Sequence, residues 1–120
     1  MFKIEFYETE TGKIPVKDFL IELPLHLRTK ATQEINLLQE LGNELREPYS
    51  KHIKNGVFEL RVKFSNDIAR IFYFFFVGEK IILTNGFIKK TQKTPTGEIE
   101  KALKYKKDYE RRKKWLLMSF

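Results

Sequence analysis

The chain has 120 residues, a length that fits one domain with a hydrophobic core of its own. It contains no cysteine, which excludes a disulfide scaffold, a cysteine-ligated zinc site and thiol catalysis. The formal net charge of +7 favours an anionic partner, with nucleic acid the commonest and an acidic protein or a membrane surface the alternative.

The N-terminal part of the chain is predicted to form one strand and two helices. In residues 2–7 apolar and polar side chains alternate, as in a half-buried strand. Pro15 suits the first turn of a short helix, and Pro24 ends it. In residues 25–41 apolar side chains recur at steps of three and four, which predicts an amphipathic helix with Gly42 as its C-terminal cap. We expect the two helices to form a hairpin that packs on a sheet.

The rest of the chain is predicted to contain a loop, three strands and a helix. Residues 44–56 indicate a connecting loop. Three antiparallel strands joined by short turns follow, at residues 58–64, 68–77 and 80–88. The middle strand is apolar on both faces apart from Arg70, so it should be the central, most covered strand. A final helix begins after residues 94–97, where either threonine can cap it.

These elements predict an α+β fold: an N-terminal strand, a two-helix hairpin, a three-stranded antiparallel meander and a C-terminal helix, with the helices on one face of the sheet. We expect one domain at residues 1–114 and an apolar C-terminal tail at residues 115–120. Charges in the first six residues are not typical of a signal peptide, and the apolar run 68–77 is too short to span a bilayer. The expectation is a cytoplasmic protein with no membrane partner.

Two arginines lie inside strongly apolar strands. Arg61 shares a strand face with Glu59 and Lys63, while Arg70 shares one with three phenylalanines. Because an unpaired buried charge costs on the order of several kcal/mol, each guanidinium needs a partner, a stacking ring or an open cleft. One interpretation is an ion pair between Arg70 and Glu59 that braces neighbouring strands. The other is a phosphate-binding cleft, to which arginine brings a two-pronged set of donors.

Further cations are expected near these arginines. Antiparallel pairing places the start of the run 87–93 beside Arg70, and the residues around 51–54 lead into the strand that carries Arg61. Cations from three segments thus meet at one end of the sheet, with Phe87 as a platform on which a base can stack. The candidate RNA-binding residues are Lys51, His52, Lys54, Lys63, Phe87 and Lys93. Of these, His52 is also a minor candidate for proton transfer.

The remaining signals are weaker. The basic C-terminal helix is either a solvated face or a contact for the backbone of ribosomal RNA or DNA. The two histidines are not spaced as a metal pair, and no glycine-rich phosphate loop is present. We therefore expect any catalysis to proceed without a metal or another cofactor.

Three motifs carry a resemblance to a known family. They are Phe-Glu-Leu-Arg at residues 58–61, Ile-Ala-Arg-Ile-Phe-Tyr at residues 68–73 and Gly-Phe-Ile-Lys-Lys-Thr-Gln-Lys-Thr-Pro at residues 86–95. In this order they resemble the RelE/ParE toxin superfamily, and specifically the phage-derived HigB-type toxins of bacterial type II toxin–antitoxin systems. One departure is Phe58, where this branch often has tryptophan.

The resemblance implies a RelE-like fold and a ribosome-dependent mRNA endonuclease. In such toxins the 2′-hydroxyl of the RNA attacks the adjacent phosphate, and no metal is required. Carried onto this chain, Arg61 and Arg70 bind the scissile phosphate and stabilise its transition-state charge. Lys89 or Lys90 serves as acid or base, and Glu59 orients Arg61 or acts as a base.

The resemblance also implies a partner, namely a cognate HigA-type antitoxin with a helix-turn-helix domain, whose complex with the toxin binds operator DNA. Two alternative functions stay open at this point. A ParE-like relative inhibits DNA gyrase and cuts no RNA. A non-catalytic nucleic-acid-binding module uses the same cations only to hold phosphate.

Overall fold

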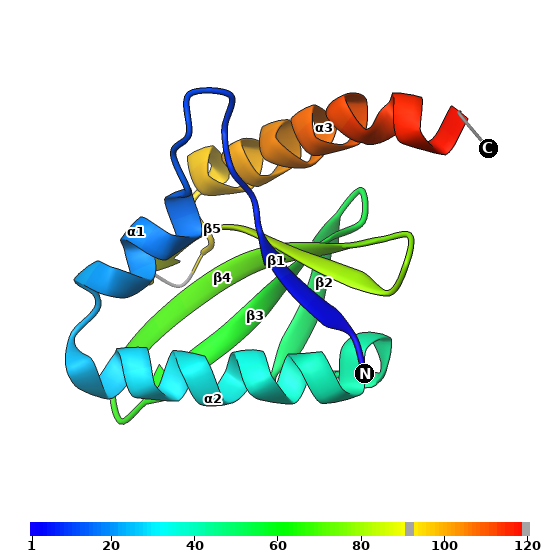
Figure 1. Cartoon of the computed structure of the whole chain (residues 1–120). Coiled ribbons are helices and arrows are strands. Elements are labelled where there is room, and N and C mark those ends of the chain that lie inside the picture. Colours follow the sequence, from blue (N-terminus) through cyan, green and yellow to red (C-terminus); the bar gives the residue numbers. More distant parts are fainter. Residues whose placement is uncertain (91–92, 119–120) are drawn as a thin grey trace.

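A mixed sheet with helices on both faces forms the molecule (Figure 1). The computed structural model describes residues 1–90 and 93–118, apart from the side chains of residues 115–117. Within these residues the elements are β1 (Lys3–Phe6), α1 (Pro15–Glu22), α2 (Leu25–Leu41), the 3-10 turn η1 (Gly42–Glu44), β2 (Ser50–Lys54), β3 (Val57–Phe64), β4 (Asp67–Phe76), β5 (Lys80–Ile88) and α3 (Thr96–Met118). The strand order is β1-β5-β4-β3-β2, in which β1 runs parallel to β5 and every other pair is antiparallel.

The N-terminal predictions are confirmed. The alternating segment forms β1 at an edge of the sheet, Pro15 begins α1, and α1 ends before Pro24. α2 ends at Gly42, whose φ of 54° is a left-handed conformation that favours glycine. A Cβ at this position would also collide with the ring of Phe2, so the end of α2 and the start of the chain fit together only around glycine.

The predicted loop at residues 44–56 is wrong in one part, because it contains the strand β2. This strand pairs with the beginning of β3 and forms the other edge of the sheet. It is mostly exposed and polar: Lys51, His52 and Lys54 are exposed, and Ile53 is its one apolar residue. Edge strands often carry such charges, which discourage pairing with other chains, and the same charges remove the alternating pattern by which a strand is recognised.

The prediction that all helices share one face of the sheet is also wrong. Helices α1 and α2 cover one face, where Leu27 and Leu38 pack with Leu60 and Ile71. Helix α3 covers the opposite face, where its buried residue Ala102 packs with Phe72. The central strand β4 is therefore covered on both faces. This is the physical reason for its continuous apolar sequence, and its central position is confirmed.

Helix α3 also includes residues 115–118 of the predicted apolar tail, whereas residues 119 and 120 lie outside the described residues. Its exposed side is strongly basic. In the part of the chain that the structure describes, no helix combines the length and the hydrophobicity that crossing a membrane requires.

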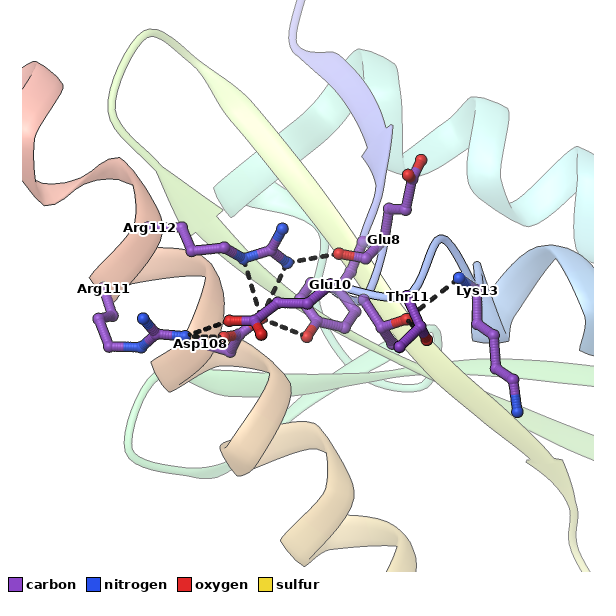
Figure 2. A network of polar contacts seen from close by, with 9 residues as sticks. Glu8, Glu10, Thr11, Lys13, Asp108, Arg111 and Arg112 are labelled. Carbon is purple, nitrogen blue, oxygen red and sulfur yellow. Dashed lines mark hydrogen bonds and ion pairs between the residues drawn. The ribbon is translucent and has the colours of Figure 1, made fainter.

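A polar network ties the loop between β1 and α1 to the middle of α3 (Figure 2). At its centre Asp108 accepts hydrogen bonds from Tyr7 at 2.5 Å, from Arg111 at 2.6 Å and from Arg112 at 3.0 Å. Arg112 also donates to the backbone carbonyl of Glu8. The hydrogen bond from Tyr7 holds the pKa of Asp108 below its ordinary value, with further support from the two arginines. Burial and the neighbouring Asp108 raise the pKa of Tyr7 to about 12.

We predict that Asp108→Asn lowers the free energy of unfolding by about 1–3 kcal/mol at neutral pH, because hydrogen bonds to a charged acceptor are lost. The pKa of Asp108 is depressed in the folded state, so its contribution is present above the unfolded pKa near 3.8 and is lost as pH falls through the folded value. Urea unfolding from about pH 6 to about pH 3 measures both effects. The wild type should lose more stability than the variant at the acidic end. The matched control is Glu100→Gln, an exposed position on the same helix that should change little.

Candidate functional site

Strand pairing brings the two predicted arginines together on the face of the sheet that α3 covers. Arg61 on β3 lies directly opposite Arg70 on β4, and Arg70 lies opposite Phe87 on β5. Two rows on toward the β3–β4 turn, Lys63 pairs with Ile68, whose carbonyl accepts a hydrogen bond from the backbone N–H of Lys89 at 2.8 Å. Side chains alternate along each strand, so Lys63 and Lys89 belong to the same face as the two arginines. The register thus gathers cations from β3, β4 and the end of β5.

A single buried carboxylate lies between the two arginines. Glu59 is only 2% exposed, and its Oε2 accepts a hydrogen bond from Arg61 Nε at 3.4 Å. Its Oε1 lies 3.4 Å from Arg70 Nε and accepts a hydrogen bond from Thr94 at 3.0 Å. The ion pair between Arg70 and Glu59 is therefore present. The hydrogen bond from Thr94 brings the segment that leads into α3 to the same carboxylate.

Arg70 has donor capacity left after these contacts. Its residue is 8% exposed, and its Nε has no partner in hydrogen-bond geometry although Glu59 is near. Within the described part of the chain, the nitrogen Nη1 donates a single long hydrogen bond of 3.4 Å, to the carbonyl of Ala69. Burial lowers the pKa of Arg70, the charge of Glu59 opposes this effect, and the charge of Arg61 adds to it. The two guanidinium groups share one buried carboxylate, Glu59, and the second carboxylate near Arg61, Glu47, is exposed to solvent. The buried part of the site therefore has a net positive charge, which suits an anion such as phosphate.

Arg61 is more exposed and faces a groove at the edge of the sheet. The groove lies where β2 begins. Ser50 pairs with Leu60, the backbone N–H of Arg61 still bonds to the carbonyl of Tyr49, and among the described residues no strand pairs with the rest of β3 on that side. Its volume is about 670 Å³, within the range of small-ligand sites. It is lined by Lys30, Glu34, Pro48, Tyr49, Arg61, Lys63, Ser65, Ile68 and Arg70. Arg61 also lies 3.8 Å from the exposed carboxylate of Glu47.

The aromatic residue that the sequence suggested as a base platform is buried. Phe87 is 8% exposed, and its ring centroid lies 5.7 Å from that of Phe72, beneath Ala102 of α3. This packing argues against base stacking on Phe87. An exposed aromatic does line the groove: Tyr49, which is 46% exposed. Tyr49 gives no signal in the sequence, because it lies in the irregular segment that was interpreted as a loop.

The predicted cations of β2 separate onto two faces. Lys51 lies opposite Glu59 and so shares the face of the arginines. His52 lies opposite Phe58, on the face that α1 and α2 cover, with its ring 5.1 Å from that of Phe58. Its Nε2 accepts a hydrogen bond from the backbone of Gly56 at 3.2 Å. The sheet therefore lies between His52 and the arginine pair, a position that does not suit proton transfer there.

The other candidates are placed as follows. Lys54 pairs with Val57 beyond a bulge in β2, and Lys90 and Lys93 are exposed on either side of residues 91 and 92, which lie outside the described part of the chain. Across residues 1–90 and 93–118, no group of three or more histidine, aspartate and glutamate side chains could hold a metal ion.

Comparison with known proteins gave one family match. The model of a family described as Phage derived protein Gp49-like matches residues 18–107. This range extends from α1 into α3 and includes Glu59, Arg61 and Arg70. A search of curated proteins found no match.

We predict that Glu59→Gln destabilises the protein by about 3 kcal/mol, because it leaves Arg70 buried without a counter-charge. The double variant Glu59→Gln/Arg70→Met should recover most of this loss, since both buried charges are then absent. Urea unfolding of the two single variants and the double variant gives the coupling energy.

The control for this cycle is Glu47→Gln, which removes the exposed partner of Arg61 and should change stability by no more than about 0.5 kcal/mol. Strictly additive effects of Glu59→Gln and Arg70→Met would show that the carboxylate does not hold this arginine in place.

Proposed function

Because the chain belongs to the phage-derived Gp49-like family, a RelE/HigB-like toxin family of toxin–antitoxin systems, we propose that it is a HigB-type toxin that cleaves mRNA on the ribosome. The observation that supports this most directly is the pair Arg61 and Arg70, opposed on neighbouring strands and oriented by one carboxylate. Their donors border a groove of nucleotide size.

The proposed reaction needs no group beyond the chain and the RNA. The 2′-oxygen of a ribose attacks the adjacent phosphorus, and its proton passes to a base. The bond from phosphorus to the 5′-oxygen breaks, that oxygen takes up a proton, and the products are a 2′,3′-cyclic phosphate and a 5′-hydroxyl end. Negative charge grows on the non-bridging oxygens of the transition state, where Arg61 and Arg70 donate hydrogen bonds.

Lys89 and Lys90 are the proposed proton-transfer residues. Lys89 is the better placed, because its backbone continues the pairing of β5 with β4 and its side chain belongs to the arginine face. Glu59 is proposed to position the arginines, since its two oxygens are already occupied by Arg61, Arg70 and Thr94.

The proposed partners follow from the same family. A cognate HigA-type antitoxin with a helix-turn-helix domain inhibits the toxin in the cytoplasm, and the complex binds operator DNA. A non-catalytic nucleic-acid-binding module is the second candidate, favoured by the exposed cations along α3 and by the position of His52 away from the arginines. A ParE-like gyrase inhibitor is the third, since the fold itself is compatible with either chemistry.

We predict that Arg70→Lys lowers mRNA cleavage by about 10²–10³-fold, because lysine keeps the charge beside Glu59 but loses the two-pronged donor geometry. Primer extension on a reporter mRNA after brief induction in cells measures the effect, with circular dichroism of the purified variant as the check on folding. The control is Lys104→Ala on the exposed side of α3, which should leave the positions of cleavage unchanged and weaken binding only modestly.

Each alternative gives a different result in the same experiment. Growth arrest with intact mRNA and damaged DNA would identify a gyrase inhibitor. Absence of both arrest and cleavage in the wild type would favour the binding module.

A further inference from the structure

One wall of the groove holds a buried carboxylate that the catalytic proposal does not use. Glu34 on α2 is 5% exposed and lines the groove together with Arg61. Its Oε1 lies 3.3 Å from Lys30 Nζ, one helical turn away. Its Oε2 is buried and has no hydrogen-bond partner among residues 1–90 and 93–118. Buried acceptors in folded proteins are nearly always satisfied, so an unpartnered one beside a groove points to a donor that arrives from outside.

The same groove offers a surface for an aromatic ring. Tyr49 lies at the groove just before β2 begins, and its backbone carbonyl accepts a hydrogen bond from the backbone N–H of Arg61 at 2.8 Å. Its side chain is half exposed. Single-stranded RNA is read by stacking of unpaired bases on such side chains, combined with hydrogen bonds to the Watson–Crick edge of the base.

We propose that this groove is a nucleobase-reading subsite, in which Tyr49 stacks on one base of the RNA and Glu34 accepts hydrogen bonds from its Watson–Crick edge. The inference rests on the proposed function, because it takes RNA as the substrate. In this proposal the phosphate of the same nucleotide lies at Arg61, because Arg61 lines the groove and is also one member of the arginine pair.

The chemistry of the wall favours guanine. A carboxylate only accepts hydrogen bonds, and guanine presents two adjacent N–H donors, at N1 and N2, whereas adenine, cytosine and uracil each present one donor group on this edge. Next to these donors guanine carries the acceptor O6, and Lys30 lies next to the carboxylate as a donor. The negative charge of Glu34 also keeps phosphate away from this wall, so the nucleotide enters with its base toward α2 and its phosphate toward the arginines.

The test is a binding measurement that does not depend on cleavage. The four nucleoside 3′-monophosphates are titrated into the purified protein and followed by two-dimensional NMR. We expect the guanosine nucleotide to bind about tenfold more tightly than the other three, in line with one good base contact. Glu34→Gln should abolish this preference and retain binding of the phosphate. Glu40→Gln, the same substitution at an exposed position of α2, should retain the preference.

A second variant covers the case in which Glu34→Gln does not fold. Tyr49→Leu removes the stacking ring from an exposed position and should weaken all four nucleotides by about tenfold or more, with the order of preference unchanged. Equal binding of all four nucleotides by the wild type would overturn the proposal. So would a guanine preference that persists in Glu34→Gln, because the buried oxygen would then be satisfied by water alone.

Mapping of cleavage sites separates this inference from the proposed function. If the wild type cleaves mRNA and Glu34→Gln leaves the distribution of cut sites unchanged, the subsite is wrong and the nuclease stands. If guanosine binding depends on Glu34 but no mRNA is cut, the nuclease proposal is wrong and the subsite stands.

Discussion

The carboxylate of Glu59 is the interaction on which the rest of the site depends. Arg61 and Arg70 face each other on paired strands, where two like charges are ordinarily destabilising. Glu59 lies within 3.4 Å of both guanidinium groups and offsets their repulsion while leaving a net positive charge. Because Glu59 and Arg70 are both buried, removing one of them leaves the other as an unpaired buried charge, which strongly destabilises the folded state.

Helix α3 makes this carboxylate effective. It covers the sheet beside the arginine pair through Ala102, Phe72 and Phe87, and this apolar cover strengthens the nearby electrostatic interactions by excluding water. The helix is fixed to the body at its start and at its middle, since Thr94 just before it binds Glu59 and Asp108 binds Tyr7 of the N-terminal segment. In both places a carboxylate with two arginines joins segments that are distant in the sequence, and Figure 2 shows the one around Asp108.

Much of this arrangement was predictable from the sequence, because it follows from periods of two and of three to four residues. The alternation in β3 and β4 placed Glu59 and Arg61 on one face, and antiparallel pairing brought Phe87 opposite Arg70. The two-sided cover of the sheet was missed, although an uninterrupted apolar strand is itself a sign of burial on both faces. Strand β2 was missed for a different reason: its polar edge sequence has no hydrophobic period.

The groove was missed because its residues come from elements that give no joint signal along the chain. Tyr49 follows a proline in an irregular segment, and Glu34 is a charged residue in a helix. The sequence nevertheless carries a sign that Glu34 is buried. It occupies the same helical stripe as the buried residues Ala31 and Leu38, where an apolar side chain is expected.

The central claim, that Arg61 and Arg70 together grip one phosphate of the RNA, is tested most directly by NMR of the arginine side chains. The Nε–H signals of the two residues can be assigned with Arg61→Lys and Arg70→Lys and then followed while a short RNA with 2′-O-methyl riboses, which cannot be cut, is added. Both signals should shift along a single binding curve, while those of Arg111 and Arg112 on α3 stay in place. Shifts confined to the arginines of α3 would contradict the account, because the RNA would then bind the basic helix and not the arginine pair.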